Sequence, residues 1–202
     1  MKIILWLLIG YIIGSISWGL IIGKVFYNTD IREHGSGNLG GTNAGRVLGA
    51  KVGVTVIVLD ALKAFLVMIL AHFISPGVEQ YAGLATCVGH CFPVFAGFRG
   101  GKAVATSYGC LLGLGIFVCH EYLFTFIIPV AVFFAIVLAT GYVSLGSMCG
   151  VSAASLLIMI FDNFTVGLMV GALALFVIYR HRTNITRIMN GTESKVNLIK
   201  KK

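Results

Sequence analysis

Long apolar stretches with almost no charged residues dominate this sequence and restrict what it can fold into. The stretch from Ile3 to Phe26 is followed by six more, over residues 52–73, 81–98, 103–119, 122–140, 143–161 and 164–179. About 20 apolar residues cross the hydrocarbon core of a bilayer as a helix. Only 11% of the 202 residues are charged, whereas soluble domains have about 25%. The sequence therefore predicts an all-α integral membrane protein, a bundle of about seven transmembrane helices forming a single domain over residues 1–202.

Two details of these stretches refine the prediction. No cleavable signal peptide is expected, because the apolar run that follows Lys2 continues to Gly23 and is long enough to span. The third and fourth stretches are short for a span and flank a glycine pair, so we expect one of them to be kinked or partly re-entrant. Tight turns are expected near residues 120, 141 and 162.

The basic residues predict the orientation in the membrane. With seven spans, Lys2 falls on one side and Lys63 lies within a span, while the other Lys and Arg residues share the opposite side. These are Lys24, Arg32, Arg46, Lys51, Arg99, Lys102, Arg180, Arg182, Arg187, Lys195, Lys200, Lys201 and Lys202. The positive-inside rule makes that side cytoplasmic, with the N-terminus outside and the C-terminus in the cytoplasm. The basic residues flank helix ends and form no face with aromatic platforms, so no nucleic-acid partner is expected despite the net charge of +8.

The cysteines give no sign of a metal or redox site. All five lie in or beside apolar stretches, none forms a CxxC pair, and no His-rich metal spacing accompanies them: Cys87, Cys91, Cys110, Cys119 and Cys149. We interpret them as small buried thiols and expect neither a metal nor a cofactor.

The first polar loop, over residues 34–46, is the strongest candidate site. It holds five glycines, two hydroxyls, two asparagines and Arg46, with no acidic residue. Glycines let the backbone approach a ligand closely, and successive free amides form a concave anion site. Residues 35–40 match the dinucleotide fingerprint G-x-G-x-x-G, but the chain offers no parallel sheet to give that pattern its meaning. The loop is therefore interpreted as a phosphate site leading into the second span, with a flexible surface loop as the alternative.

The second candidate lies between the third and fourth stretches. Arg99 and Lys102 bracket the pair Gly100–Gly101 just before an apolar helix. The segment fails the P-loop pattern, because Ala96 replaces the first glycine and Ala103 replaces the Ser or Thr that binds magnesium. A cationic turn with free amides at a helix N-terminus remains as a second place for phosphate, the alternative being ordinary interfacial anchoring. His90, a few residues earlier, reads as a helix-end histidine rather than a base.

The third candidate follows the last span and ends in the only acid of the tail, Glu193. Basic residues after a last span are expected from topology alone, whereas Asn184 and Glu193 are not. His181 could orient or deprotonate a hydroxyl. Glu193 could tether a basic loop through Arg46 or Arg182.

Two ionisable residues, Asp60 and Lys63, lie about midway along the second span at positions i and i+3. Such groups are costly in a membrane and are functional by default. A mutual structural ion pair explains them equally well.

Taken together, the three loops resemble the bacterial acyl-phosphate:glycerol-3-phosphate acyltransferase family. The matching motifs are Gly35-Ser36-Gly37-Asn38-x-Gly40-x-Thr42-Asn43-x-x-Arg46, Gly89-His90-x-x-Pro93-x-Phe95-x-x-Phe98-Arg99-Gly100-Gly101-Lys102-x-Val104-Ala105-Thr106, and His181-Arg182-x-Asn184-Ile185-x-Arg187-x-x-x-Gly191-x-Glu193. The sequence departs from the usual pattern at Gly41, Arg99 and Ala103, where Ala, Lys and Gly are common. The resemblance covers essentially the whole chain, including the seven spans.

The resemblance implies transfer of a fatty acyl group from acyl-phosphate to the 1-hydroxyl of sn-glycerol 3-phosphate, giving lysophosphatidic acid and phosphate. It implies a multi-pass enzyme of the bacterial cytoplasmic membrane, surrounded by lipid and facing the cytoplasm with its active site, and we expect a monomer. The catalytic residues expected are Ser36, Arg46, Lys102, His181 and Asn184. The substrate-binding residues expected are Gly37, Asn38, Thr42, Asn43, Arg99, Gly100, Gly101, Arg182, Gly191 and Glu193.

Other functions remain open at this point. An anion transporter or channel would also place basic loops on one side, but it predicts polar residues in several spans, which are nearly free of charge here. A lipid-phosphate phosphatase needs a histidine nucleophile with a His-Asp partner. A scaffold protein would not gather its glycines, asparagines and cations into loops on one side. The enzyme interpretation requires the three loops to converge on one positively charged pocket.

Overall fold

The regular structure in residues 1–196, the part of the chain that the computed structural model describes, is entirely helical. Lys200, Lys201 and Lys202, predicted above to be cytoplasmic, lie outside the described residues. The chain divides into two compact units, the first over Met1–Val118 and the second from Cys119 onward. The all-α prediction is confirmed, and a single domain over residues 1–202 stays a prediction.

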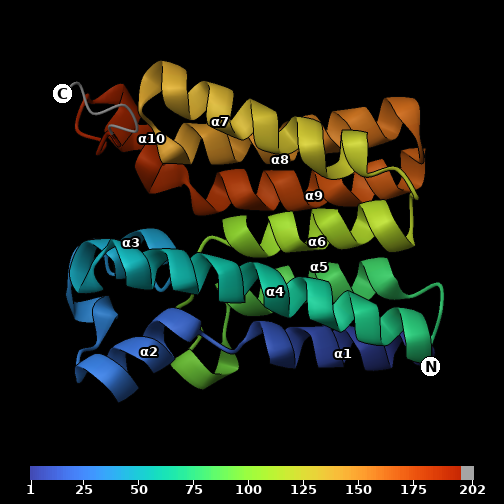
Figure 1. Cartoon of the computed structure of the whole chain (residues 1–202), viewed down its shortest axis with the longest axis horizontal. Helices are drawn as coiled ribbons and strands as arrows, with labels where there is room; N and C mark the ends of the chain where they lie inside the picture. The colour runs from blue at the N-terminus through green and yellow to red at the C-terminus, as the bar shows by residue number, and fades with distance from the viewer. Residues whose placement is uncertain (197–202) are drawn as a thin grey trace. The chain divides into compact units, whose positions relative to one another are not determined.

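The first unit is a bundle in which α1, α4, α5 and α6 run side by side (Figure 1). Its elements are α1 (Lys2–Gly14), α2 (Trp18–Tyr27), the 3₁₀ turn η1 (Ile31–Glu33), α3 (Gly41–Leu48), α4 (Ala50–Ile74), α5 (Glu79–Cys91), the 3₁₀ turn η2 (Val94–Ala96) and α6 (Val104–Phe117). Small residues bring the helix backbones close together. A Cβ on Gly14 would overlap the backbone of Thr86 between α1 and α5, and one on Gly109 would overlap Ala61 between α6 and α4. Such contacts are typical of membrane helix packing, where close approach replaces the hydrophobic effect.

The second unit consists mainly of three long helices packed side by side, α7 against α8 and α8 against α9 (Figure 1). A short π-helical turn, η3 (Leu123–Ile127), leads into α7 (Ile128–Thr140), followed by α8 (Val143–Phe161), α9 (Phe164–Arg180) and α10 (Arg182–Met189). Tight turns join α7 to α8 at Gly141 and α8 to α9 at Asp162, as predicted. Gly141 has a φ of 78°, a left-handed conformation that favours glycine.

The number of membrane crossings differs in detail from the expectation. Within residues 1–196, four helical stretches are long and apolar enough to span: 2–27, 50–74, 123–140 and 143–161. The bent pair α9 and α10 adds a fifth if the two helices are counted as one span. The expected third and fourth spans contain only the 13-residue α5 and the 14-residue α6, which are short for the hydrocarbon core. Helix α5 ends at Cys91, because the residue before Pro93 is disfavoured in the α region. Seven crossings and their orientation stay predictions.

The structure adds one detail and one correction to these expectations. The first apolar run is long and apolar enough to span, as expected, although its helix is interrupted between Gly14 and Trp18. Of the five cysteines, Cys87, Cys91 and Cys110 are buried as expected, whereas Cys119 and Cys149 are only half-buried.

Candidate active site

The first polar loop is held in shape by one buried side chain, Asn43 of α3. Its Nδ2 donates to the carbonyls of Ile31 (2.8 Å) and His34 (3.2 Å), and its Oδ1 accepts from the amide of Ser36 (2.8 Å). Asn43 is 1% exposed, and a buried amide needs such partners because leaving its groups unpaired is costly. A second asparagine, Asn38, accepts from the amide of Gly40 at the start of α3 (2.9 Å). The side-chain amides of both asparagines therefore hold the backbone of the loop in shape.

Two hydroxyl side chains and one cationic side chain of the loop face solvent. Ser36, Thr42 and Arg46 are all exposed, and their side chains make no hydrogen bond or ion pair with any residue in the described part of the chain. Thr42 and Arg46 are four residues apart on α3 and therefore share a face. The Arg46 stem passes close to Gly35, where an added Cβ would lie 3.4 Å from the Arg46 Cδ. This arrangement suits an anionic ligand that accepts hydrogen bonds.

The five glycines of this loop have different tasks. Gly35 and Gly37 adopt φ values of 60° and 69°, which favour glycine in this turn. Gly41 and Gly45 instead face α4, where a Cβ on Gly53 would lie 2.6 Å from the Gly45 Cα. Part of the glycine content that suggested a phosphate site therefore serves helix packing.

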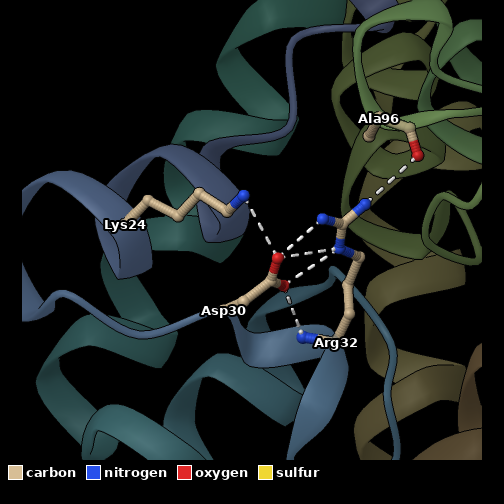
Figure 2. A network of polar contacts seen from close by, with 4 residues as sticks. All are labelled: Lys24, Asp30, Arg32 and Ala96. Carbon is tan, nitrogen blue, oxygen red and sulfur yellow. Dashed lines mark hydrogen bonds and ion pairs between the residues drawn. The ribbon is translucent and has the colours of Figure 1, made fainter.

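An ion cluster joins the segment that precedes the first polar loop to η2 (Figure 2). Asp30 accepts from the Arg32 guanidinium at 2.6 and 2.9 Å and pairs with Lys24 at 3.2 Å. Arg32 also donates to the carbonyl of Ala96 in η2 (3.4 Å). The hydrogen bond from Arg32, with help from Lys24, holds the pKa of the Asp30 carboxyl well below its usual range, although partial burial opposes this. The carboxylate is therefore charged at neutral pH.

An open cavity of about 440 Å³ lies beside this cluster. Its lining combines cations with apolar groups: Leu20, Lys24, Arg32, Phe95, Ala96, Gly97 and Arg99. Arg99 is the only lining residue predicted from the sequence as substrate-binding. From the sequence alone, Lys24 and Arg32 predict only the orientation in the membrane. The local signal for their second role is the acidic residue between them in the sequence, Asp30.

The segment over residues 97–103, called the glycine turn below, connects η2 to α6. Gly97, Phe98 and Ala103 all have positive φ values, of 64°, 61° and 57°. Ala103 is fully buried at the N-cap of α6, in a left-handed conformation that favours glycine. Within the turn, Gly100 and Gly101 are buried, Lys102 is half-buried and Arg99 is exposed.

The predicted ion pair between Asp60 and Lys63 is confirmed, with 2.9 Å between Lys63 Nζ and Asp60 Oδ1. The same ammonium contacts His90 Nδ1 on α5 (2.9 Å). Sequence reasoning missed His90 as a partner, because it is distant in the chain and nothing local marks it.

The third motif lies at the junction of α9 and α10, which are bent by 57° relative to each other. His181 sits at this bend, buried, with Nδ1 2.8 Å from the carbonyl of Val177. Because a carbonyl can only accept, Nδ1 carries the proton, and Nε2 of the neutral ring is the basic nitrogen. Arg182 is exposed, with its guanidinium 4.7 Å from the centre of the Tyr179 ring.

Glu193 organises the end of this motif. Its Oε1 accepts from Asn184 Nδ2 (2.6 Å) and Ser144 Oγ (2.8 Å), and its Oε2 accepts from Arg187 Nε (2.8 Å). These hydrogen bonds outweigh partial burial and lower the pKa of the carboxyl. The suggested tether through Arg182 is wrong, since Glu193 pairs with another cation of the same tail, Arg187. Gly191 provides the turn, with a φ of 70°.

The structure thus brings the first two motifs together within the first unit and the third motif within the second unit. The convergence of all three on one pocket stays a prediction.

Comparisons with known proteins identify the family of the chain. Residues 4–191 match the family model described as glycerol-3-phosphate acyltransferase. A glycerol-3-phosphate acyltransferase of Listeria monocytogenes is 46% identical over 199 residues, covering 96% of this chain and 97% of the relative. One of Geobacillus kaustophilus is 50% identical over 192 residues, covering 94% of each.

Two crystal structures are also similar. Both are of PlsY, an integral membrane glycerol 3-phosphate acyltransferase, one in its glycerol 3-phosphate form and one in its lysophosphatidic acid form. The first superimposes with a TM-score of 0.87 at 35% identity, covering 98% of this chain and 96% of the other; the second has a TM-score of 0.84 at 34% identity. The matched length, the sequence identity and the common helical fold show that the chain belongs to the glycerol-3-phosphate acyltransferase family of integral membrane proteins.

Proposed function

We propose that this protein transfers a fatty acyl group from an acyl-phosphate to the 1-hydroxyl of sn-glycerol 3-phosphate, releasing lysophosphatidic acid and phosphate. The observation that carries the proposal is that the side chains of Ser36, Thr42 and Arg46 are exposed. None of them makes a hydrogen bond or ion pair with another described residue, so all three can bind a ligand. The related PlsY structures are of a glycerol 3-phosphate form and a lysophosphatidic acid form, which correspond to a substrate and a product of such a reaction.

The proposed chemistry uses an already activated donor. The 1-hydroxyl oxygen attacks the acyl carbonyl carbon, the bond from that carbon to the phosphate oxygen breaks, and inorganic phosphate leaves. The hydroxyl proton goes either to the departing phosphate or to Nε2 of His181, whose tautomer suits this task. Positioning and charge neutralisation therefore supply most of the acceleration.

The proposed catalytic residues are Ser36, Arg46, Lys102, His181 and Asn184. Arg46 and Lys102 neutralise phosphate charge as it develops, and each such donor contributes about 2–4 kcal/mol to the transition state.

The proposed substrate-binding residues fall into two groups, those that can touch a ligand and those that shape the loops. Thr42, Arg99 and Arg182 are exposed and able to meet a ligand directly. The remaining members shape their loops by hydrogen bonds, turn conformation or close packing: Gly37, Asn38, Asn43, Gly100, Gly101, Gly191 and Glu193.

We place the enzyme in the bacterial cytoplasmic membrane as a seven-span monomer, with its N-terminus outside and its three motifs facing the cytoplasm. The clustering of Lys and Arg next to the motifs supports this orientation. Both substrates are phosphate anions and one has a lipid tail, which suits a cationic site at a membrane surface.

The test is a reaction of purified protein with palmitoyl-phosphate and glycerol 3-phosphate, followed by phosphate release and lysophosphatidic acid formation. Parallel reactions with palmitoyl-CoA and palmitoyl-acyl carrier protein examine the donor. Arg46→Gln should lose activity, whereas Lys51→Gln, a matched removal of an exposed charge outside the motifs, should not. Activity with the thioesters alone would refute the donor assignment, and no lysophosphatidic acid from any donor would refute the function.

A further inference from the structure

A buried ion cluster lies in the first unit, outside the residues assigned to the reaction. It consists of Asp60 and Lys63 on α4 and His90 on α5, whose side chains are only 2%, 3% and 6% exposed. Buried charges in a membrane segment are expensive, and removing one partner leaves the other uncompensated. A cluster of this kind therefore needs an explanation beyond the stability of the helix pair.

The Lys63 ammonium stands at the centre of the cluster. It donates to the carbonyl of Ile16 (2.9 Å), contacts His90 Nδ1 (2.9 Å) and forms an ion pair with Asp60 Oδ1 at 2.9 Å. Ile16 lies where the first apolar run breaks between α1 and α2. An interrupted helix in a membrane leaves carbonyls to be satisfied, and Lys63 satisfies this one.

The contact with Lys63 also determines the state of His90. An ammonium can only donate, so His90 Nδ1 accepts, and the proton of the neutral imidazole is on Nε2. Asp60 Oδ1 lies 3.4 Å from the same Nδ1 and 2.9 Å from the ammonium, so the three groups are in mutual contact. The imidazole is therefore held in one orientation by the cluster.

The glycine turn rests directly on this imidazole. Gly101 leaves no room for a side chain, because a Cβ there would overlap His90 Nε2 and lie 2.9 Å from both neighbouring ring carbons. The amide of Gly101 donates to the carbonyl of His90 (3.0 Å), and the amide of Gly100 donates to that of Cys91 (3.2 Å). Gly101 does not have a positive φ, so close packing against His90, rather than backbone conformation, is what excludes a side chain.

We infer that the ion cluster of Asp60, Lys63 and His90 is a positioning device that seats the glycine turn and thereby sets the place of Lys102. This inference rests on the proposed function of Lys102 and gives a reason for the charges inside the second span. None of the three cluster residues needs to touch a substrate; His90 acts through Gly101 and the backbone that follows it.

The kinetic test uses the set His90→Ala, His90→Asn and Gly101→Ala. In His90→Ala, the KM for at least one phosphate substrate should rise about tenfold or more, since an ångström of misplacement costs up to about a hundredfold. His90→Asn returns an acceptor near the Nδ1 position, so it should restore the unfolding temperature in detergent without restoring KM. Loss of folded protein alone would lower the apparent kcat at constant KM.

A double-mutant cycle isolates the contact between His90 and Gly101. Gly101→Ala should be severe in the wild-type background, because its methyl meets the imidazole, and mild in His90→Ala, where the ring is gone. The matched control is His72→Ala, which removes another histidine–carboxylate contact between α4 and α5, the 2.9 Å pair with Glu79. This variant should lower stability and leave both KM values unchanged.

Amide hydrogen exchange tests the inference without any activity measurement. In His90→Ala, the peptide over residues 99–103 should exchange faster than in the wild type, while it stays protected in His72→Ala. A wild-type protein without acyltransferase activity would overturn the proposed function yet leave this experiment decisive. Three results would each overturn the positioning role. The first is an unchanged exchange rate of residues 99–103 in His90→Ala, and the second is a wild-type KM in His90→Asn. The third is a double mutant in which the effects of His90→Ala and Gly101→Ala simply add.

Discussion

Asn43 offers the sharpest test of how the first loop is built. Replacing it with alanine removes hydrogen bonds to Ile31, His34 and Ser36. The bond to the Ile31 carbonyl is fully buried, so its loss costs about 1–3 kcal/mol. The other two are partly exposed and water can replace them, so each costs at most about 1 kcal/mol. The expected loss in the free energy of unfolding is therefore about 1–5 kcal/mol, summed from these contributions.

The assay is chemical unfolding in detergent micelles, combined with acyl-transfer kinetics. Asn43→Asp should be no better than Asn43→Ala, because the carboxylate keeps the acceptor for Ser36 but faces two carbonyl oxygens instead of donating to them. Asn190→Ala, which changes an exposed asparagine, is the control and should leave stability within about 0.5 kcal/mol. Wild-type stability and wild-type kinetics in Asn43→Ala would refute the claim that this side chain organises the loop.

Three further substitutions test other parts of the structure. His181→Ala should lower kcat at every pH by about a hundredfold or more, the usual contribution of a general base; a small loss with no change in pH profile would assign the proton to the departing phosphate. Glu193 has a pKa lowered below its usual value of 4.5, so its stabilising contribution is complete above that pH and is lost as the pH falls through the lowered folded-state pKa. Glu193→Gln should therefore flatten the acid side of a plot of unfolding temperature against pH, and a profile that keeps its wild-type slope would contradict this. Gly53→Ala should destabilise by about 1–3 kcal/mol through overpacking, because its methyl would lie 2.6 Å from the Gly45 Cα, whereas Gly45→Ala, with 3.4 Å to the Gly53 Cα, should be tolerated; equal unfolding free energies for the two variants would contradict the close α3–α4 packing.

Local patterns proposed the residues of the candidate site, but they could not show what each side chain does in the folded chain. The Gly, Asn and Arg content of residues 34–46 marked a phosphate loop, and Arg46 is indeed exposed there. The same pattern could not show that Asn43 is occupied by the loop's own backbone, or that Gly45 packs on Gly53. Amide hydrogen bonding and close packing favour the same residue types as ligand binding, so composition does not separate them.

The sequence by itself determined that the chain is helical and embedded in a membrane, because only helices satisfy the backbone of long apolar segments in lipid. It also determined the family, through three motifs whose residue types suit phosphate. Tertiary structure alone decided that Lys63 reaches the carbonyl of Ile16, that His90 supports Gly101, and that Glu193 bonds Arg187 rather than Arg182. The first two contacts join helices distant in the chain, and the third is a choice between two cations in one tail. Periodicity and local spacing predict none of these three contacts, because each depends on how the helices pack and turn in space.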